Sequence, residues 1–384
     1  MATCDVIVVG AGGMGSAAAA HLAARGQRVL VLERFSLAHD RGSSHGLTRI
    51  IRLAYFEHPS YVPLLRRAYE LWRALEARAG QQLLHVTGAL DVGVEGSRVF
   101  EGSRRSCLEH DLPHEVLTGG DLRRRFPAWR IDHHAAAVFQ PDGGFLLPER
   151  CILAHAAVAR AAGATVHEGE TVRDWSAGSG RVRVATDRGI YEAGQLVLSA
   201  GAWMGNLVPG LARLMMPERQ VLGWFAVSNP PAFAPARFPV FVHDAPEGLF
   251  YGFPEHAVEG FKIGKYHHLA QAAAPDALDR DCRVEDEAAL RGAVARYFPS
   301  ANGALRRSAV CMFTNTPDEH FIIDRHPDAG AVLLVSPCSG HGFKFCSVVG
   351  EIVADLVTRG ETPHDIAAFR LARFHVPEPG AATG

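Results

Sequence analysis

Three glycines near the N-terminus have the spacing of a dinucleotide-binding turn. Gly10, Gly12 and Gly15 form the pattern GxGxxG directly after an apolar, β-branched run at residues 6–9. In this pattern the first glycine permits a tight turn, the second admits a pyrophosphate close to the backbone, and the third lets the next helix pack on the strand. The spacing therefore predicts that phosphates bind at the N-terminus of a helix over residues 16–25.

An acidic residue follows at the distance that suits a ribose. A second apolar run, residues 29–32, ends at Glu33, whose carboxylate can accept hydrogen bonds from ribose hydroxyls and disfavours a 2′-phosphate. The next residue, Arg34, is assigned to the same cofactor-binding site. GxGxxG alone is a weak signal, but strand, glycines, helix, strand and acid in register predict FAD or NAD as the cofactor.

Length and composition bound the kind of protein. A chain of 384 residues suggests roughly two domains, and 48% hydrophobic with 21% charged residues is typical of a globular enzyme. The net charge of −2 predicts no nucleic-acid partner, and the glycines within the apolar residues 6–24 argue against a membrane span. Without an export signal, we expect a cytoplasmic protein whose seven cysteines are reduced thiols.

The segments that must position these residues show two kinds of sequence pattern, one of alternating strands and helices and one mainly of strands. The sequence predicts an α/β fold, with a Rossmann-like doubly wound nucleotide-binding domain and a second, mainly β-sheet substrate domain inserted discontinuously. We assign residues 1–83, 147–216 and 317–372 to the first domain and residues 84–146 and 217–316 to the second. Residues 84–94 and 136–147 are expected to be strands, and residues 373–384 a Gly/Ala/Pro-rich tail.

Seven motifs, in order along nearly the whole chain, resemble one known family. They are DVIVVGAGGMGSA, HGLTRIIRLAY, LVLSAGAW, FYGFPEH, FKIGKYHH, AVCMFTNTPDEHFIID and SGHGFKF. With them the chain resembles the monomeric sarcosine oxidases and N-methyltryptophan oxidases. The resemblance implies a monomeric flavoprotein with an FAD-binding domain of the glutathione-reductase type. It also implies oxidation of a small secondary amino acid, with O2 as electron acceptor and hydrogen peroxide as a product.

The resemblance also assigns a cysteine and a pair of cations. The family links its flavin covalently through a cysteine, and Cys311 stands at the matching position. Nearby cationic groups would raise the thiolate fraction of such a cysteine, although a lone cysteine in AVCMF is otherwise typical of core packing. Arg52 and Lys344 match the family's clamp for the substrate's carboxylate, a group that arginine binds in a bidentate manner.

The remaining site residues follow from the same resemblance. Lys262 matches the lysine that activates oxygen, His45 and Arg49 match residues beside the flavin ring, and Tyr251 matches a tyrosine that faces the substrate. Either His267 or His268 could match an active-site histidine, and we choose His267 because Tyr266 and His267 keep a Tyr-His pair. The turn before the last helix could present N–H groups to the flavin and contains Gly340, His341 and Gly342.

Several alternatives stay open. The substrate could be N-methyltryptophan, pipecolate or another secondary amino acid, and the electrons could pass to a carrier as in a flavin-dependent amine dehydrogenase. A non-catalytic FAD-binding module would not need Arg52, Lys262 and Lys344 together, and an NAD-dependent dehydrogenase fits only the first forty residues. We predict no metal, because the side chains of adjacent histidines such as His133 and His134 usually diverge.

Overall fold

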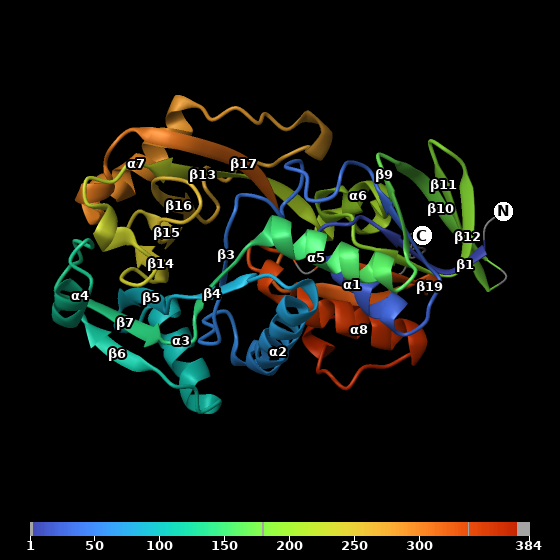
Figure 1. Cartoon of the computed structure of the whole chain (residues 1–384), viewed down its shortest axis with the longest axis horizontal. Coiled ribbons are helices and arrows are strands. Elements are labelled where there is room, and N and C mark those ends of the chain that lie inside the picture. Colours follow the sequence, from blue (N-terminus) through green and yellow to red (C-terminus); the bar gives the residue numbers. More distant parts are fainter. Residues whose placement is uncertain (1–2, 179, 337, 375–384) are drawn as a thin grey trace, which may run out of the picture. The chain divides into compact units, whose positions relative to one another are not determined.

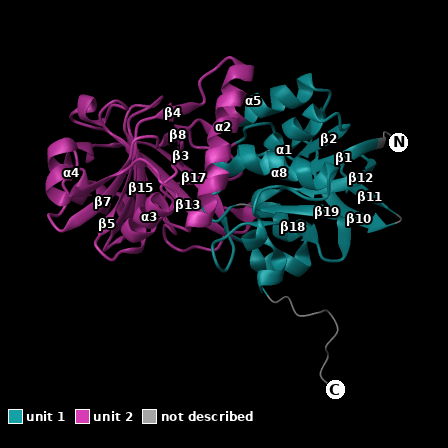
Figure 2. Ribbon diagram, turned by 90° about the horizontal axis from the view of Figure 1, so that it is seen from below, with its two compact units in different colours: residues 1–39, 152–216, 314–384 teal, residues 40–151, 217–313 magenta. Residues whose placement is uncertain are grey.

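The computed structural model describes residues 3–178, 180–336 and 338–374. The chain divides into two compact units, coloured separately in Figure 2. Unit 1 comprises Met1–His39, Ile152–Met216 and Thr314–Gly384, and unit 2 comprises Asp40–Cys151 and Pro217–Phe313. The predicted tail lies outside the described residues from residue 375 onward.

Unit 1 is built on a sheet whose central strands run parallel, as the doubly wound prediction requires. The parallel neighbours are β9, β2, β1, β12 and β19, while β10, β11 and β18 pair in the antiparallel sense at the margins (Figure 1; β2 and β18 are labelled in Figure 2). β-Branched residues dominate the buried strands at its centre, where both faces are covered. The strands are β1 (Thr3–Val9), β2 (Val29–Glu33), β9 (Thr165–Glu168), β10 (Val172–Gly178), β11 (Arg181–Thr186), β12 (Ile190–Leu198), β18 (Ile322–His326) and β19 (Ala329–Ser336).

Glycines let two helices of unit 1 approach each other closely. A Cβ atom added to Gly13 would lie 2.5 Å from the Cys346 sulfur, and one added to Gly350 would lie 2.6 Å from the Ala17 backbone. Cys346 is therefore a packing residue. The first of these two helices, α1, begins at Gly13 rather than at residue 16, so it includes Gly15, the last glycine of the motif. The helices are α1 (Gly13–Ala24), α5 (Pro148–Ala161), α6 (Met204–Leu207) and α8 (Cys346–Thr358).

Unit 2 is dominated by a second large sheet, in the order β17-β13-β16-β15-β14-β5-β7-β6. A smaller sheet has the order β3-β8-β4. The strands are β3 (Arg49–Ile51), β4 (Leu84–Val86), β5 (Ala89–Val94), β6 (Glu115–Thr118), β7 (Ala135–Gln140), β8 (Gly144–Leu146), β13 (Met216–Phe225), β14 (Val240–Ala245), β15 (Gly248–Phe253), β16 (Phe261–Lys265) and β17 (Leu305–Asn315). The helices are α2 (Val62–Ala79), α3 (Arg98–Glu109), α4 (Gly119–Arg125) and α7 (Val284–Tyr297).

The core of unit 2 is aromatic. Phe241 stacks on Phe261 with ring centroids 6.0 Å apart, and Trp129 and Phe298 lie 4.6 Å and 5.1 Å from Phe241. These large side chains fill the space beneath one face of the sheet. The opposite face of the strands carries further apolar clusters as well as polar side chains.

The division into units differs from the sequence-based boundaries mainly at residues 40–83, which group with unit 2. The reason is pairing: β3 and β4 both pair with β8, which the sequence already placed in the second domain. The predicted strand at 84–94 is also two strands, because Gly88 turns the chain with φ +78°. In the described part of the chain, no helix combines the length and apolarity needed to cross a membrane.

Candidate active site

The glycine turn after β1 has no room for side chains. Gly10 has φ +89°, and a Cβ there would lie 2.7 Å from the Ser199 carbonyl oxygen. A Cβ on Gly15 would lie only 1.8 Å from the carbonyl oxygen of Gly10. Gly12 precedes α1 and has no side chain with which to cap it, so the first N–H groups of the helix can serve a phosphate. The turn fits the pyrophosphate of a dinucleotide.

Glu33 ties the end of β2 to this turn. Its carboxylate accepts hydrogen bonds from the backbone N–H groups of Ala11 at 2.7 Å and Phe35 at 2.9 Å, and His39 lies 3.4 Å away. Burial acts to raise the pKa of Glu33, but the hydrogen bonds from His39, Ala11 and Phe35 outweigh it and lower the pKa. The group is an ionised acceptor beside the phosphate turn, as a ribose partner must be. Arg34 places its guanidinium 5.2 Å from the Phe35 ring.

The segment before α8 forms a second, tightly held turn in unit 1. Gly340 has φ +75°, and His341 donates a ring N–H to the Glu319 carbonyl at 2.9 Å. Gly342 precedes a short 3-10 helix, Phe343–Phe345, that leads into α8. Lys344 is buried and donates from Nζ to the His341 carbonyl at 2.6 Å.

Lys262 is the central charged residue of unit 2. It is only 2% exposed, and its Nζ donates to the Gly46 carbonyl at 2.7 Å, the Thr48 carbonyl at 2.9 Å and the Thr48 hydroxyl at 2.8 Å. Its neighbours across the sheet place aromatic rings beside it, Phe253 at 4.2 Å and Trp224 at 5.3 Å. Burial lowers the pKa of Lys262 well below its usual range, and the charge of Arg49 adds to the effect.

Arg49 shares an acceptor with this lysine. Its guanidinium donates to the Thr48 carbonyl at 2.9 Å and to the Ser43 carbonyl at 2.7 Å. His45 is buried in the same segment, where Gly46 turns the chain with φ +98°. Backbone carbonyls of one loop therefore hold both Arg49 and Lys262. These hydrogen bonds involve no carboxylate, so they do not neutralise the positive charge.

Cys311 lies buried in β17, near the same charges. Burial raises the pKa of its thiol, while the positive charges of Arg49, Lys262 and Arg280 act in the lowering direction without overcoming it. The cations that the sequence interpretation required are present, but the expected gain in thiolate is outweighed by desolvation. The sequence could not predict the direction of this pKa shift, because the shift depends on burial.

The tyrosine of β15 and the end of β16 define one face of the sheet. Tyr251 pairs with Gly264, and a Cβ on that glycine would lie 2.5 Å from the Tyr251 hydroxyl, so the phenol covers the glycine. Burial raises the pKa of Tyr251. Strand alternation puts Lys262 and Gly264 on the same face. Tyr266 follows the end of β16, donates its backbone N–H to the Leu249 carbonyl at 2.8 Å and has its ring 5.2 Å from that of Phe313.

His267 lies beyond the end of β16. It has φ +55°, its side chain is 40% exposed, and Nδ1 lies 2.8 Å from Glu218. Lys265, two positions earlier, is a regular member of β16 paired with Phe250.

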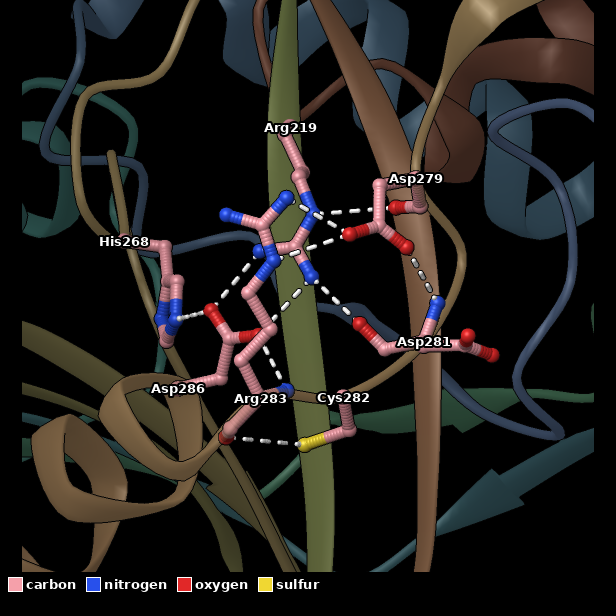
Figure 3. Close-up of polar contacts among 7 residues, drawn as sticks. All are labelled: Arg219, His268, Asp279, Asp281, Cys282, Arg283 and Asp286. Atoms are coloured by element: carbon pink, nitrogen blue, oxygen red, sulfur yellow. Dashed lines mark hydrogen bonds and ion pairs between the residues drawn. The ribbon is translucent and has the colours of Figure 1, made fainter.

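His268, the other candidate histidine, belongs to a buried ion-pair cluster (Figure 3). Its Nε2 lies 2.9 Å from Asp286, whose carboxylate also accepts from both terminal nitrogens of Arg219 at 2.7 Å and 2.8 Å. Despite its burial, these hydrogen bonds lower the pKa of Asp286 to about 2. The cluster fastens the segment after β16 to α7 and β13.

Arg52 has a different set of partners from Arg49. It is 2% exposed, with Nε 3.1 Å from Asp91 and a terminal nitrogen 3.1 Å from Glu57. Burial opposes its charge, but the two carboxylates dominate and raise its pKa further. The predicted clamp residues fall in separate units, Arg52 in unit 2 and Lys344 in unit 1.

The sequence interpretation missed several residues of these groups. Thr48 could have been found from its place next to Arg49. Asp91 gave no signal, because a single acid in ALDVGV is not a motif. In the described part of the chain one group has the makings of a metal site: Asp132, His133 and His134 are exposed, and the two rings lie 3.7 Å apart instead of diverging.

The fold and the glycine turn define a class, the dinucleotide-binding flavoproteins, and comparison with known proteins agrees. A family model described as FAD dependent oxidoreductase matches residues 5–356. The chain belongs to this FAD-dependent oxidoreductase family. The family match identifies the cofactor as FAD, so the NAD-dependent alternative is set aside.

Relatives within the family are similar over nearly their full length. The chain is 42% identical to a monomeric sarcosine oxidase of Streptomyces avermitilis, covering 96% of this chain and 97% of the relative. It is 34% identical to an N-methyl-L-tryptophan oxidase of Yersinia pestis, covering 96% and 99%. Among solved structures, NikD, an amino acid oxidase of nikkomycin biosynthesis, is 27% identical with a TM-score of 0.83, covering 96% and 98%. The predicted fold class and family are thereby confirmed.

Proposed function

We propose that this chain is an oxidase of secondary amino acids, with sarcosine as the favoured substrate. The reaction would convert sarcosine, O2 and water into glycine, formaldehyde and hydrogen peroxide. The observation that carries the proposal is the group formed by the buried Lys262 and Cys311 with the partly buried Arg49 and Tyr251, on neighbouring elements of unit 2. The 42% identity to monomeric sarcosine oxidases supports the choice of substrate.

The residues of unit 1 fit FAD. Gly10, Gly12 and Gly15 would hold its pyrophosphate, Glu33 with Arg34 its ribose end, and the turn at Gly340, His341 and Gly342 its ring. Bound FAD would supply the two-electron acceptor for oxidation of the C–N bond. We further propose that Cys311 attaches it covalently: the new S–C bond would replace the S–H bond of the thiol and one C–H bond of the ring's methyl group, and the two electrons released would pass to O2 to give hydrogen peroxide. The thiol would have to lose its proton against the effect of burial.

Arg52 and Lys344 would hold the substrate's carboxylate, and Tyr251 would face the substrate. A guanidinium suits this task because its planar donors match a carboxylate. Arg52 already pairs with Glu57 and Asp91, so the substrate competes with charges that the protein itself supplies. With its carboxylate held in this way, the substrate would react at its amine end.

Lys262 would act on oxygen, while His45 and Arg49 would lie beside the flavin ring. Oxygen becomes negatively charged as it takes up electrons, and fixed positive charge in a water-poor site stabilises that change. Lys262 is suited to this because three acceptors hold its Nζ in place. No protein base is required if the amine binds neutral.

One sample tests the proposal. The purified protein should be yellow, the colour should remain with the precipitate after acid treatment, and anaerobic sarcosine should bleach the native spectrum. Cys311→Ala is the matched control: its colour should move to the supernatant. Peroxide formed in air should equal the sarcosine consumed. A colourless parent that takes up no added FAD would contradict the central claim, and a yellow parent that sarcosine does not bleach would exclude this substrate.

The oxygen reaction is expected to slow as the pH rises. The ammonium form of Lys262 is the active one, and it is lost as the pH passes upward through the pKa. Burial and Arg49 lower this pKa more than Glu149 and Cys311 raise it, so the midpoint should fall below the ordinary value of 10.5. The measurement is the rate of flavin reoxidation against pH. The prediction would be contradicted if the reoxidation rate of Lys262→Met fell with rising pH in the same way, or if the midpoint of the parent lay at or above pH 10.5.

The relatives suggest one second candidate, oxidation of N-methyltryptophan, because an oxidase of that name is 34% identical. Bleaching by N-methyltryptophan but not by sarcosine would favour it. Turnover with an artificial acceptor but without peroxide would instead indicate a dehydrogenase. We also propose a cytoplasmic monomer, which the names of the sarcosine oxidase relatives and the free cysteines support.

A further inference from the structure

A carboxylate lies inside one of the central strands of unit 2. Asp91 is in the middle of β5, between β14 and β7, and is 2% exposed. Leu90 and Val92, its neighbours, point into the aromatic core. Asp91 therefore points to the opposite face, which α3 covers.

Two groups hold this carboxylate. Arg52 donates from Nε at 3.1 Å and 3.3 Å to the two oxygens of Asp91. Ser103, a buried residue of α3, donates its hydroxyl to Oδ2 of Asp91 at 2.6 Å. The carboxylate is thus fixed from the helix side by a hydroxyl and faces the guanidinium on the other.

Asp91 and Glu57 contact different nitrogens of Arg52. Glu57 accepts from the terminal NH2 group at 3.1 Å and 3.4 Å, whereas Asp91 accepts from Nε, which lies on the side of the aliphatic stem. The guanidinium is planar, so an acceptor on Nε fixes the direction of the plane and with it the terminal N–H groups. The rings of Tyr55 and Phe56 lie 4.9 Å and 4.8 Å from its central carbon.

Stability alone gives little reason for this arrangement. A buried ion pair is often replaced by apolar residues without loss of stability, because desolvation offsets the attraction. What apolar residues cannot do is orient a planar donor. The buried Asp91–Ser103 pair supplies that orientation to the residue that our proposed function assigns to the substrate's carboxylate.

We propose that Asp91, oriented by Ser103, is a positioning residue that holds Arg52 in the plane in which it binds the carboxylate of the substrate. Asp91 does not touch the substrate. Its effect should be confined to ligands that carry a carboxylate. This inference rests on the proposed role of Arg52.

The test compares binding and turnover in variants of the FAD-loaded protein. In Asp91→Ala, the KM for sarcosine and the Kd for acetate, measured from the flavin spectrum, should both rise about tenfold, with kcat within about threefold. Asp91→Asn should recover most of the loss, because the amide oxygen still accepts from Nε. Ser103→Ala should raise both constants about threefold. The KM of sarcosine methyl ester, which has no carboxylate, should not change in any of them.

The control is a second buried ion pair of the same unit. Asp286→Asn weakens the Arg219 pair of Figure 3 and should leave the Kd of acetate unchanged, which separates positioning from general destabilisation. If Asp91→Ala does not fold, Asp91→Asn and Ser103→Ala carry the test. Acetate binding that is unchanged or tighter in Asp91→Ala, or in Ser103→Ala if that variant alone folds, would overturn the inference and leave the oxidase function intact.

A failure of the proposed function looks different. The acetate titration needs no turnover, so it reports on Asp91 even if sarcosine is not oxidised. Arg52→Ala should weaken acetate binding at least as much as Asp91→Ala. If Arg52→Ala leaves acetate binding unchanged, Arg52 is not the carboxylate ligand and the role of Asp91 is overturned with it.

Discussion

Lys262→Met is expected to slow reoxidation by oxygen by at least about a hundredfold, while reduction by sarcosine stays within a few-fold of the parent. Removing one preorganised charge from a buried site typically has an effect of this size. Methionine keeps the length and apolar stem of lysine but cannot donate to Gly46 and Thr48. Rapid mixing of the reduced protein with oxygenated buffer measures the first rate, and anaerobic mixing with sarcosine measures the second.

Lys265→Met is the matched control for this experiment. Lys265 is in the same strand but an odd number of positions away, so its side chain points to the other face. It should reoxidise like the parent. Equal reoxidation of the parent and Lys262→Met would remove the oxygen role of Lys262. A parallel loss in both half-reactions would indicate instead that the loop at residues 46–48 had lost its anchor.

Gly15→Ala is expected to abolish FAD binding, with less than about a tenth of the parent's flavin content. The added Cβ would lie 1.8 Å from the Gly10 carbonyl oxygen and 2.6 Å from the Ser199 hydroxyl. Because one of these atoms is backbone, the turn itself must shift, and overpacking of this kind costs about 1–3 kcal/mol or more. The ratio of flavin to protein absorbance, with a thermal melt, measures both effects.

Gly210→Ala provides the comparison within the same unit. A Cβ at Gly210 meets nothing within 4 Å, so flavin content and melting temperature should match the parent. A Gly15→Ala protein with full flavin content would mean that the turn is more adaptable than its geometry indicates. It would also remove the argument that this glycine sets the approach of α1 to β1.

Motifs that are local in the chain could be predicted well. Strand, turn, helix and acid at residues 3–33 depend on φ angles and on periodicity, which neighbouring residues largely fix. The turn at Gly340, His341 and Gly342 before the last helix was found for the same reason. Longer apolar runs were predicted less well, since the strand at 84–94 breaks at Gly88 where the chain needs a positive φ.

The choice between His267 and His268 shows what a local argument leaves open. Matching a Tyr-His pair led to His267, but the motif could not show that Lys265 is a regular member of β16, paired with Phe250, and that both histidines follow its end. A shift of one residue changes the face, because side chains in a strand alternate. Pairing between strands settles such a register, and a motif alone does not.

By itself the sequence determined the nucleotide-binding turn, the α/β class and the family, because these follow from local spacing and from motifs along the whole chain. Only the tertiary structure decided which charges meet. Lys262 meets the Gly46 carbonyl across 216 positions and Arg52 meets Asp91 across 39, while burial sets the pKa of Cys311. Ion pairing and desolvation depend on distance and burial in space, and spacing along the chain specifies neither.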